Sequence, residues 1–231
     1  MAYKAVIFDL FGTLVRSFSE KEFKAMLGKM ASVLEAPGDD FVNLWIETYN
    51  AQATGKEGFR SIESTIEYCC RVFNLDCDPT KINEASRIRF DYTRVHMKPW
   101  KDVLPTLSEL RRRRLKIGLI TDCTPELPLI WPETPLVSVI DNPSFSCNVG
   151  IKKPDRRIYH LSCKNLDVRP QECLYVGDGS SDELSGATHA GLNPVGISIP
   201  EEQTFDAYRI NKEEWVGLKV SSIGEILHLV A

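Results

Sequence analysis

The chain has 231 residues and a formal net charge of −4, because 28 lysines and arginines face 32 aspartates and glutamates. A weakly acidic protein of this kind is poorly suited to nucleic acid or an anionic membrane surface as its main partner. Its apolar runs are much shorter than the roughly 20 residues that a membrane-spanning helix needs. With 43% hydrophobic and 26% charged residues, the composition is typical of a globular protein with one domain and a large insertion, or with two small domains.

The seven cysteines are an odd number and have no short regular spacing. Cys69 and Cys70 are adjacent, and neither begins a Cys-x-x-Cys pair. We therefore expect reduced thiols rather than a disulfide framework or a zinc site. The N-terminus enters a strand-like run instead of a secretory leader, so a cytoplasmic location is the default expectation. The sequence gives no indication of the oligomeric state.

The first predicted element is a strand over residues 3–8, whose apolar run Ala-Val-Ile-Phe is typical of a strand buried on both faces. The strand ends at Asp9, and Gly12 marks a loop. The next segment, residues 17–98, has no clear strand pattern and contains several amphipathic helical patterns. They cover residues 20–34, 41–53, 62–73 and 79–95. The pattern predicts a helical insertion after the first strand.

Strands and helices alternate in the rest of the chain. Strands are predicted at 116–120, 173–176 and 194–197, and more weakly at 137–140 and 218–220. Helices are predicted at 103–113, 155–165, 180–190 and 222–230. This alternation indicates an α/β fold with a Rossmann-like parallel sheet. We expect residues 1–16 and 99–231 to form this core, and residues 17–98 to form a separate helical domain.

Polar residues follow three of the predicted strands. Asp9 follows the first strand, Thr121 and Asp122 follow the second, and Asp178 follows the strand that ends near Val176. In an open parallel sheet, ligands bind beyond the carboxyl ends of the strands. We therefore expect these side chains, which are distant in the sequence, to meet in one site.

Four short motifs occur in a characteristic order. They are Phe8-Asp9-Leu10-Phe11-Gly12-Thr13-Leu14, Ile120-Thr121-Asp122, Lys152-Lys153-Pro154-Asp155 and Gly177-Asp178-Gly179-Ser180-Ser181-Asp182. Together they resemble the signature motifs of the haloacid dehalogenase-like hydrolase superfamily. The resemblance covers nearly the whole chain, since residues 17–98 match the helical cap that this superfamily inserts after its first motif.

The resemblance implies a role for each motif. Asp9 matches the catalytic nucleophile, and Lys153 matches the lysine that orients it. Thr121 matches the residue that holds a substrate phosphoryl oxygen, and Asp122 belongs to the same motif. Asp9, the backbone carbonyl of Phe11, Asp178 and Asp182 match the magnesium ligands. Backbone N–H groups of the first loop, including those of Gly12 and Thr13, could add hydrogen-bond donors for the substrate.

Elementary chemistry agrees with this assignment. A carboxylate can attack phosphorus and form an aspartyl phosphate, which divides one difficult displacement into two easier steps. Asp9, Asp178 and Asp182 carry three negative charges, which Lys153 and one Mg²⁺ would balance. A hard dication suits oxygen ligands. The sequence therefore predicts a magnesium-dependent hydrolase, in the first place a phosphatase acting on a small phosphorylated metabolite.

Phe11 departs from the phosphatase pattern. Phosphatases of the superfamily usually carry a second aspartate at this position as the general acid and base, whose loss typically costs about 10²–10⁴ in rate. Haloacid dehalogenases of the superfamily have an aromatic residue there and use no metal. Phosphonate hydrolases also lack the aspartate but need a lysine from the cap. The lysines in or beside the cap are Lys21, Lys24, Lys29, Lys56, Lys81 and Lys98.

A third alternative is a binding or regulatory member of the family with little turnover. Asp122 supports this alternative together with Phe11, because the family often has Asn at the position of Asp122, where an extra negative charge opposes a phosphate. We expect the cap to choose the substrate. Its aromatic residues, or those beside it, are candidates for the pocket wall: Trp45, Tyr49, Tyr68, Tyr92 and Trp100.

Overall fold

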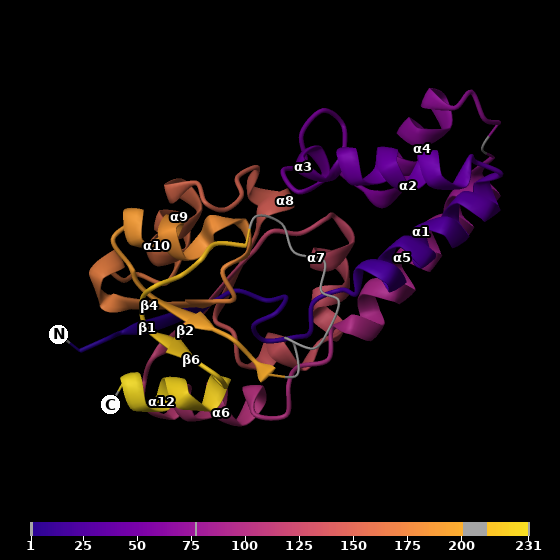
Figure 1. The fold of residues 1–231 in the computed structure, drawn as a ribbon. Coiled ribbons are helices and arrows are strands. Elements are labelled where there is room, and N and C mark those ends of the chain that lie inside the picture. The colour runs from indigo at the N-terminus through magenta and orange to yellow at the C-terminus, as the bar shows by residue number, and fades with distance from the viewer. Residues whose placement is uncertain (1, 77, 201–211, 231) are drawn as a thin grey trace.

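The computed structural model describes residues 2–76, 78–200 and 212–230. A parallel sheet with helices on both faces forms one end of the molecule, and a layer of helices forms the other (Figure 1). Both termini lie at the end that contains the sheet, away from the helical layer. The predicted α/β fold with a Rossmann-like parallel sheet is confirmed.

The sheet contains six strands in the order β3-β2-β1-β4-β5-β6, and all neighbouring strands are parallel. The strands are β1 (Ala5–Phe8), β2 (Lys116–Thr121), β3 (Asn142–Phe145), β4 (Cys173–Gly177), β5 (Asn193–Ile197) and β6 (Lys219–Val220). In the centre, Phe8 of β1 is in register with Leu119 of β2 and Val176 of β4. The residues that follow these three strands therefore come together at one edge of the sheet.

The third strand along the chain is not where we expected it. The apolar residues 137–140 overlap the 3-10 helix η2 (Pro135–Ser138), and β3 begins only at Asn142. Pro135 opens this short helix, where its fixed φ is tolerated. The strand itself contains Pro143, which is possible because β3 lies at the edge of the sheet. The weaker strand expected at 218–220 is confirmed as β6.

Alternating residues of β1 supply the two faces of the core, as the period of a strand requires. Val6 and Phe8 pack with α6 (Val103–Arg112) and α12 (Ile226–Leu229) on one face. Ala5 and Ile7 pack on the other face with α9 (Arg156–Asn165) and α10 (Glu183–His189). All four residues of β1 are completely buried, so the apolar run identified in the sequence lies at the centre of the sheet.

Five helices lie in the described part of residues 17–98. They are α1 (Glu20–Leu34), α2 (Gly38–Glu47), α3 (Tyr49–Gln52), α4 (Ile62–Val72) and α5 (Pro79–His96). The side chains of Ser19, Ser61 and Asp78 cap the N-termini of α1, α4 and α5. The buried apolar residues of α1, α2, α4 and α5 form a core of their own. The four expected helical segments are present, one of them divided into α2 and α3.

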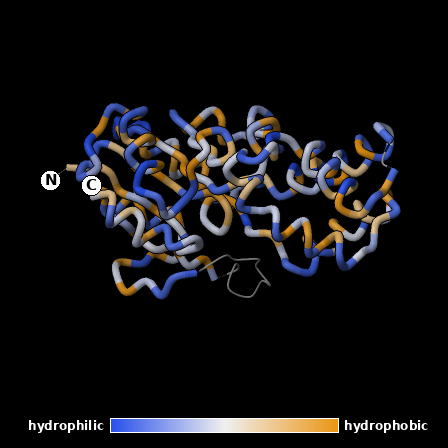
Figure 2. Tube along the Cα trace, turned by 90° about the horizontal axis from the view of Figure 1, so that it is seen from above, coloured by the Kyte–Doolittle hydropathy of each residue, from blue (hydrophilic) through white to orange (hydrophobic). Residues whose placement is uncertain are grey.

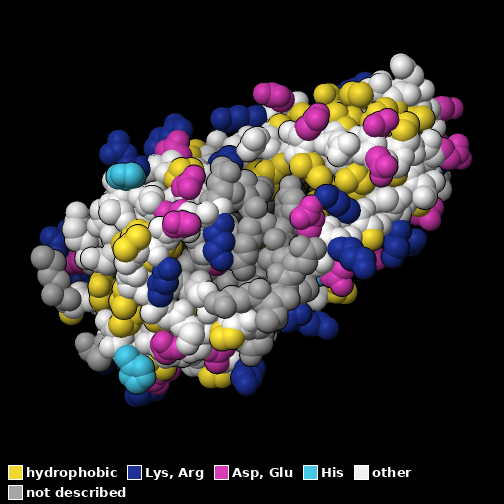
Figure 3. Space-filling model, in the orientation of Figure 1, with side chains coloured by type: hydrophobic (Ala, Val, Ile, Leu, Met, Phe, Trp, Pro, Cys, Tyr) yellow, Lys and Arg dark blue, Asp and Glu magenta, His cyan; other side chains and the backbone are white. Residues whose placement is uncertain are grey.

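Apolar residues lie mostly inside the molecule and charged residues lie mostly on its surface. Seen from above in Figure 2, apolar segments lie inside both ends of the elongated molecule. On the face drawn in Figure 3, basic and acidic side chains of the described residues are interspersed. No helix in the described part of the chain is both long enough and apolar enough to cross a bilayer.

The cysteines agree only in part with the expectation of reduced thiols. Five cysteines have free thiols: Cys69, Cys123, Cys147, Cys163 and Cys173. Cys70 is disulfide-bonded, so the expectation is wrong for this residue. A disulfide framework is nevertheless absent from the described residues, which keep most thiols free.

Candidate functional site

Four charged side chains from distant parts of the sequence meet beyond the carboxyl ends of β1 and β4. Lys153 Nζ lies 2.5 Å from Asp9 Oδ1 and 2.6 Å from Glu183 Oε2. Asp9, Asp178 and Glu183 each offer an oxygen within 4.8 Å of the other two. The four side chains are almost completely buried. If all are ionised, this cluster carries a net charge of −2.

Glu183 is the member of the cluster that sequence reasoning missed. Its Oε2 accepts hydrogen bonds from Lys153 and from the Tyr175 hydroxyl, and its Oε1 accepts one from the backbone N–H of Gly179. Both oxygens are therefore engaged, and Glu183 is suited to holding Lys153 in place. Gly177 leaves room for this side chain, because a Cβ atom there would collide with the Glu183 carboxylate.

Asp182, which we expected among the metal ligands, does not join this cluster. It precedes α10 with a left-handed backbone (φ 50°) and lines a separate surface pocket with Pro154 and His189. Ser181 before it also has a positive φ of 59°. These two residues delay the start of α10, so that the following residue, Glu183, is directed toward Lys153.

The local electrostatics depend on this pairing. Burial alone would lower the pKa of Lys153, but the charges of Asp9 and Glu183 hold that pKa well above its ordinary value. Burial and then the charge of Asp9 raise the pKa of Glu183 to about 7, although Lys153 acts in the opposite direction. The lysine is therefore a fixed cation that keeps neighbouring carboxylates together in a region that water hardly reaches.

The donor set could hold a hard dication. Mg²⁺ prefers one or two carboxylates and retains several waters, and Asp9 and Asp178 are two carboxylates that directly follow the adjacent strands β1 and β4. The loop after β1 passes close to Asp178 because Gly12 has no side chain: a Cβ atom there would lie 2.8 Å from Asp178 Oδ2. The excess negative charge of the cluster favours such an ion in addition to Lys153. The residues present fit magnesium.

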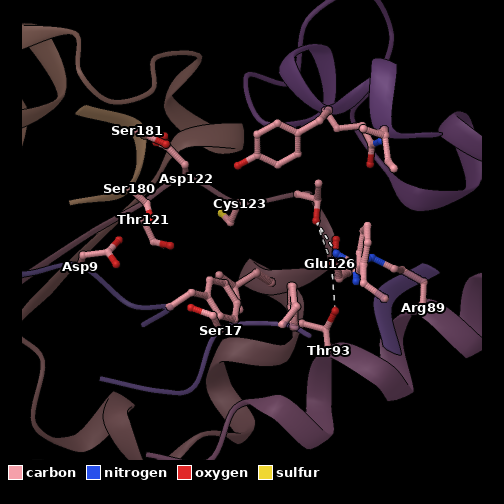
Figure 4. A pocket seen from close by; sticks show the side chains of 18 of the residues that line it. Asp9, Ser17, Arg89, Thr93, Thr121, Asp122, Cys123, Glu126, Ser180 and Ser181 are labelled. Carbon is pink, nitrogen blue, oxygen red and sulfur yellow. Dashed lines mark hydrogen bonds and ion pairs between the residues drawn. The ribbon is translucent and has the colours of Figure 1, made fainter. Parts of the chain in front are cut away.

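A pocket opens between the sheet edge and the helical layer (Figure 4). Its wall includes Asp9, Thr121, Asp122 and Lys153, so the structure brings these expected site residues together. Thr13 lies behind the wall, and its hydroxyl donates a hydrogen bond to Asp9 Oδ2 over 3.3 Å. Much of the remaining lining is apolar and aromatic. It includes Phe11, Phe18, Phe23, Trp45 and Tyr49.

The pocket wall bears on the alternatives that the sequence left open. The ring of Phe11 contacts that of Phe18, with their centroids 4.8 Å apart, so it is part of an aromatic wall and provides no acid. Lys153 is the lysine of the pocket, and none of the six lysines named for the cap is among the lining residues. This placement gives the phosphonate hydrolase alternative no support. Of the aromatic candidates, Trp45 and Tyr49 line the pocket, whereas Tyr68, Tyr92 and Trp100 are not among the lining residues.

A buried ion pair joins the helical layer to the segment after β2. Arg89 of α5 lies 2.6 Å from Glu126 of α7 (Glu126–Ile130), and their side chains are only 4% and 1% exposed. Thr124 and Thr93 donate further hydrogen bonds to Glu126, as the dashed lines in Figure 4 show. Both residues line the pocket, and the pair links α5 of the helical layer to α7, which follows β2.

Breaking this pair from one side should destabilise the protein strongly. Glu126→Gln leaves the Arg89 charge buried without a counter-ion, so we expect the free energy of unfolding to fall by about 3–5 kcal/mol. Denaturation in urea measures the change. The double variant Arg89→Met/Glu126→Gln should recover most of the loss, because it removes both charges. A double variant less stable than Glu126→Gln alone would contradict this explanation.

Most of the chain matches the model of a known protein family. A family model described as haloacid dehalogenase-like hydrolase matches residues 3–191. The protein belongs to this family. It is therefore a haloacid dehalogenase-like hydrolase, and the site at the sheet edge lies where the motifs of the family converge.

Relatives in this family catalyse two kinds of reaction. A glyceraldehyde 3-phosphate phosphatase from Methanopyrus kandleri is 26% identical over 206 residues, covering 88% of this chain and 87% of that protein. An (S)-2-haloacid dehalogenase from Pseudomonas sp. strain YL is 24% identical, covering 84% of this chain and 82% of that protein. The phosphatase and the dehalogenase are similar to this chain to nearly the same degree.

Solved structures agree on the fold. A phosphatase of this family from Thermococcus onnurineus has a TM-score of 0.64 at 20% identity and covers 99% of this chain and 98% of its own. An L-2-haloacid dehalogenase from Xanthobacter autotrophicus has a TM-score of 0.63 at 18% identity with the same coverage. At these identities the similarity establishes the fold, and the choice between the two chemistries depends on the site.

Proposed function

We propose that this hydrolase is a magnesium-dependent phosphatase that acts on a small phosphorylated molecule through an aspartyl phosphate at Asp9. The observation that carries the proposal is the charge of the buried cluster: Asp9 and Glu183 contact one lysine, and a third carboxylate, Asp178, lies beside these two. A phosphate ester would add more negative charge to this place. A bound dication offsets that charge, whereas halide displacement at carbon needs no such ion.

In this proposal the Asp9 carboxylate attacks phosphorus and the ester oxygen leaves toward the pocket. Lys153 keeps Asp9 in position through its 2.5 Å contact and offsets part of the charge on the phosphoryl group. Thr121 Oγ1 is buried in the pocket wall and has no hydrogen-bond partner among the described residues. It is therefore available to donate to a phosphoryl oxygen, with backbone N–H groups near Gly12 as further donors.

The residues that would hold magnesium are Asp9, Asp178 and the backbone carbonyl of Phe11. When bound, the ion would draw electron density from the phosphoryl group and offset its charge. Asp182 stands outside the buried cluster, and we propose no contact with the ion for it. Glu183 is proposed as the positioning residue for Lys153.

The helical segment of residues 17–98 is proposed as a cap that encloses the substrate. It contributes Phe18, Trp45 and Tyr49 to the pocket, while residues 1–16 and 99–231 are proposed as the hydrolase core. A closed cap excludes water from the reacting groups and selects the substrate. The apolar wall suits a small molecule whose carbon skeleton packs against aromatic rings.

Dehalogenase chemistry is the second candidate, and Phe11 is the observation that favours it. Phe11 lies on the pocket wall at the position where a phosphatase of the family has its general acid, and a departing halide needs no proton. The buried cluster argues against this candidate, because Asp178 and Glu183 add negative charge beside the attacking carboxylate without serving halide departure.

Metal removal separates the two candidates. We expect chelator-treated protein to be inactive toward a panel of phosphate monoesters and Mg²⁺ to restore turnover. Mg²⁺ at 100 times its Kd should also stabilise the protein by about 2.7 kcal/mol, which thermal unfolding detects without any substrate. Asp178→Asn should abolish this stabilisation. Metal-independent halide release from a 2-haloacid would establish the dehalogenase instead, and no turnover of either substrate class would favour a binding protein.

A further inference from the structure

Asp122 is a carboxylic acid of the pocket that the proposed reaction has not used. Three carboxyl groups line the pocket: those of Asp9, Asp122 and Glu126. Asp9 is ion-paired with Lys153 and Glu126 with Arg89, whereas none of the ion pairs within 4.0 Å among the described residues includes Asp122. Asp122 Oδ2 is buried and has no hydrogen-bond partner there. This oxygen is therefore free to carry a proton.

The same lysine holds both Asp122 and the nucleophile in position. The backbone N–H of Lys153 donates to Asp122 Oδ1 over 3.0 Å, and its side-chain Nζ contacts Asp9 Oδ1. Asp122 directly follows β2, and Asp9 directly follows the neighbouring strand β1. Figure 4 shows Asp122 next to Thr121 at the pocket wall. The carboxyl group is thus anchored on one oxygen beside the reacting centre, with the other oxygen unengaged.

The surroundings of Asp122 favour its neutral form. Burial raises the pKa of Asp122, while Lys153 and Lys152 act in the opposite direction and Asp9 raises it further. Tyr49 of α3 lies close enough for the charge of Asp122 to raise the tyrosine pKa as well, after the larger effect of burial. Cys123 is the next residue along the chain and lines the same pocket. Asp122 is therefore a carboxyl group that can keep its proton nearer to neutral pH than an ordinary aspartate.

We propose that Asp122 is the general acid and base of this hydrolase and replaces the aspartate that is absent at Phe11. The proposal rests on the proposed phosphatase function. In the first step Asp9 forms a bond to phosphorus, the bond from phosphorus to the ester oxygen breaks, and the proton of Asp122 Oδ2 moves to that oxygen. In the second step water attacks phosphorus, Asp9 is released, and Asp122 takes the proton from the water. Alcohol and phosphate leave, and both residues return to their initial states.

The test compares two leaving groups in the magnesium-loaded protein. Asp122→Asn keeps the size of the side chain and an acceptor for the Lys153 N–H, but has no proton that titrates. We expect a loss of about 10²–10⁴-fold in kcat/KM for glycerol phosphate, whose alkoxide needs a proton to leave. With 4-nitrophenyl phosphate, whose leaving group departs as a stabilised anion, we expect little change in kcat/KM, because kcat/KM reports the first step and not the attack of water that follows. Asp167→Asn makes the same chemical change at an exposed site and should behave as the unchanged protein.

The pH dependence gives a second measurement. The donor must be protonated in the first step, so kcat/KM for glycerol phosphate should fall as pH rises through the raised pKa of Asp122. This decrease should be absent in Asp122→Asn. A thermal unfolding curve equal to that of the unchanged protein excludes misfolding as the cause of lost activity.

Other outcomes overturn the proposal. Equal losses of kcat/KM for both substrates mean that Asp122 only positions the phosphoryl group. An unchanged kcat/KM for glycerol phosphate means that Asp122 has no part in proton transfer. If the unchanged protein hydrolyses neither ester, the phosphatase function itself fails. If it hydrolyses both esters and Asp122→Asn does the same, only the role of Asp122 fails.

Discussion

Replacement of Asp9 by asparagine is expected to lower phosphate release by at least about 10⁴-fold. The amide is nearly the same size as the carboxylate, but it is a poor nucleophile and cannot form the proposed aspartyl phosphate. A steady-state assay of phosphate release measures the loss. Mass spectrometry of protein quenched during turnover should detect the added phosphoryl group on the unchanged protein, and should not detect it on the variant.

Asp167→Asn is the matched control, because the same chemical change is made at an exposed aspartate that does not line the pocket. Its activity should equal that of the unchanged protein. Turnover by Asp9→Asn at an undiminished rate would rule out Asp9 as the nucleophile. A loss accompanied by a lower unfolding temperature would point to misfolding, so both variants are compared by thermal unfolding.

Replacement of Lys153 by methionine is expected to produce the largest effect on stability. Methionine has a similar length but no charge, so Asp9 and Glu183 lose the cation that lies within 2.6 Å of each. Removing one partner from a buried ion pair typically costs about 3–5 kcal/mol. Urea denaturation with chelator present measures the free energy of unfolding, and phosphatase activity should be lost as well.

The pH dependence of this variant has a definite sign. Without Lys153, the pKa of Glu183, which is already raised, rises further above its value in the unfolded chain because the lysine no longer lowers it. Such groups stabilise the folded protein at pH values below their unfolded pKa, and this contribution disappears as pH rises through the folded pKa. The deficit of Lys153→Met should therefore be smaller at pH 5 than at pH 8.

Lys152→Met is the control for this comparison. Lys152 is the adjacent residue, and its Nζ is 6.0 Å from the centre of the Tyr49 ring, so the same substitution there removes no close buried ion pair. We expect its free energy of unfolding to change by less than about 1 kcal/mol. Equal destabilisation of the two variants would contradict the importance of the buried pair.

The fold was predictable where the sequence pattern and the burial agree. The apolar run before Asp9 is β1, completely buried between two neighbouring strands, and the helical patterns of residues 17–98 correspond to α1 to α5. The pattern failed at residues 137–140, because apolar residues also occur in a tight 3-10 turn that packs against the core. Burial requires apolar side chains but does not decide between a strand and a turn.

The candidate site was predictable at the ends of strands and less so in the loop after β4. Asp9, Asp178 and Thr121 follow or end strands of a parallel sheet, so their positions follow from topology. Glu183 joins the buried cluster in place of Asp182 because two successive non-glycine residues have a positive φ. Such a conformation is uncommon outside glycine and has no clear pattern in the sequence. The collision that a side chain at Gly177 would cause is visible only once the fold is known.

The contact between Arg89 and Glu126 has a consequence for how the pocket opens. If α5 moves away from α7, two charges that are now almost completely shielded must be separated and hydrated together. Dissolved salt screens such sheltered charges only weakly. The escape of products should consequently depend little on ionic strength. The arrival of an anionic substrate at a protein with a net charge of −4 should instead accelerate when salt is added.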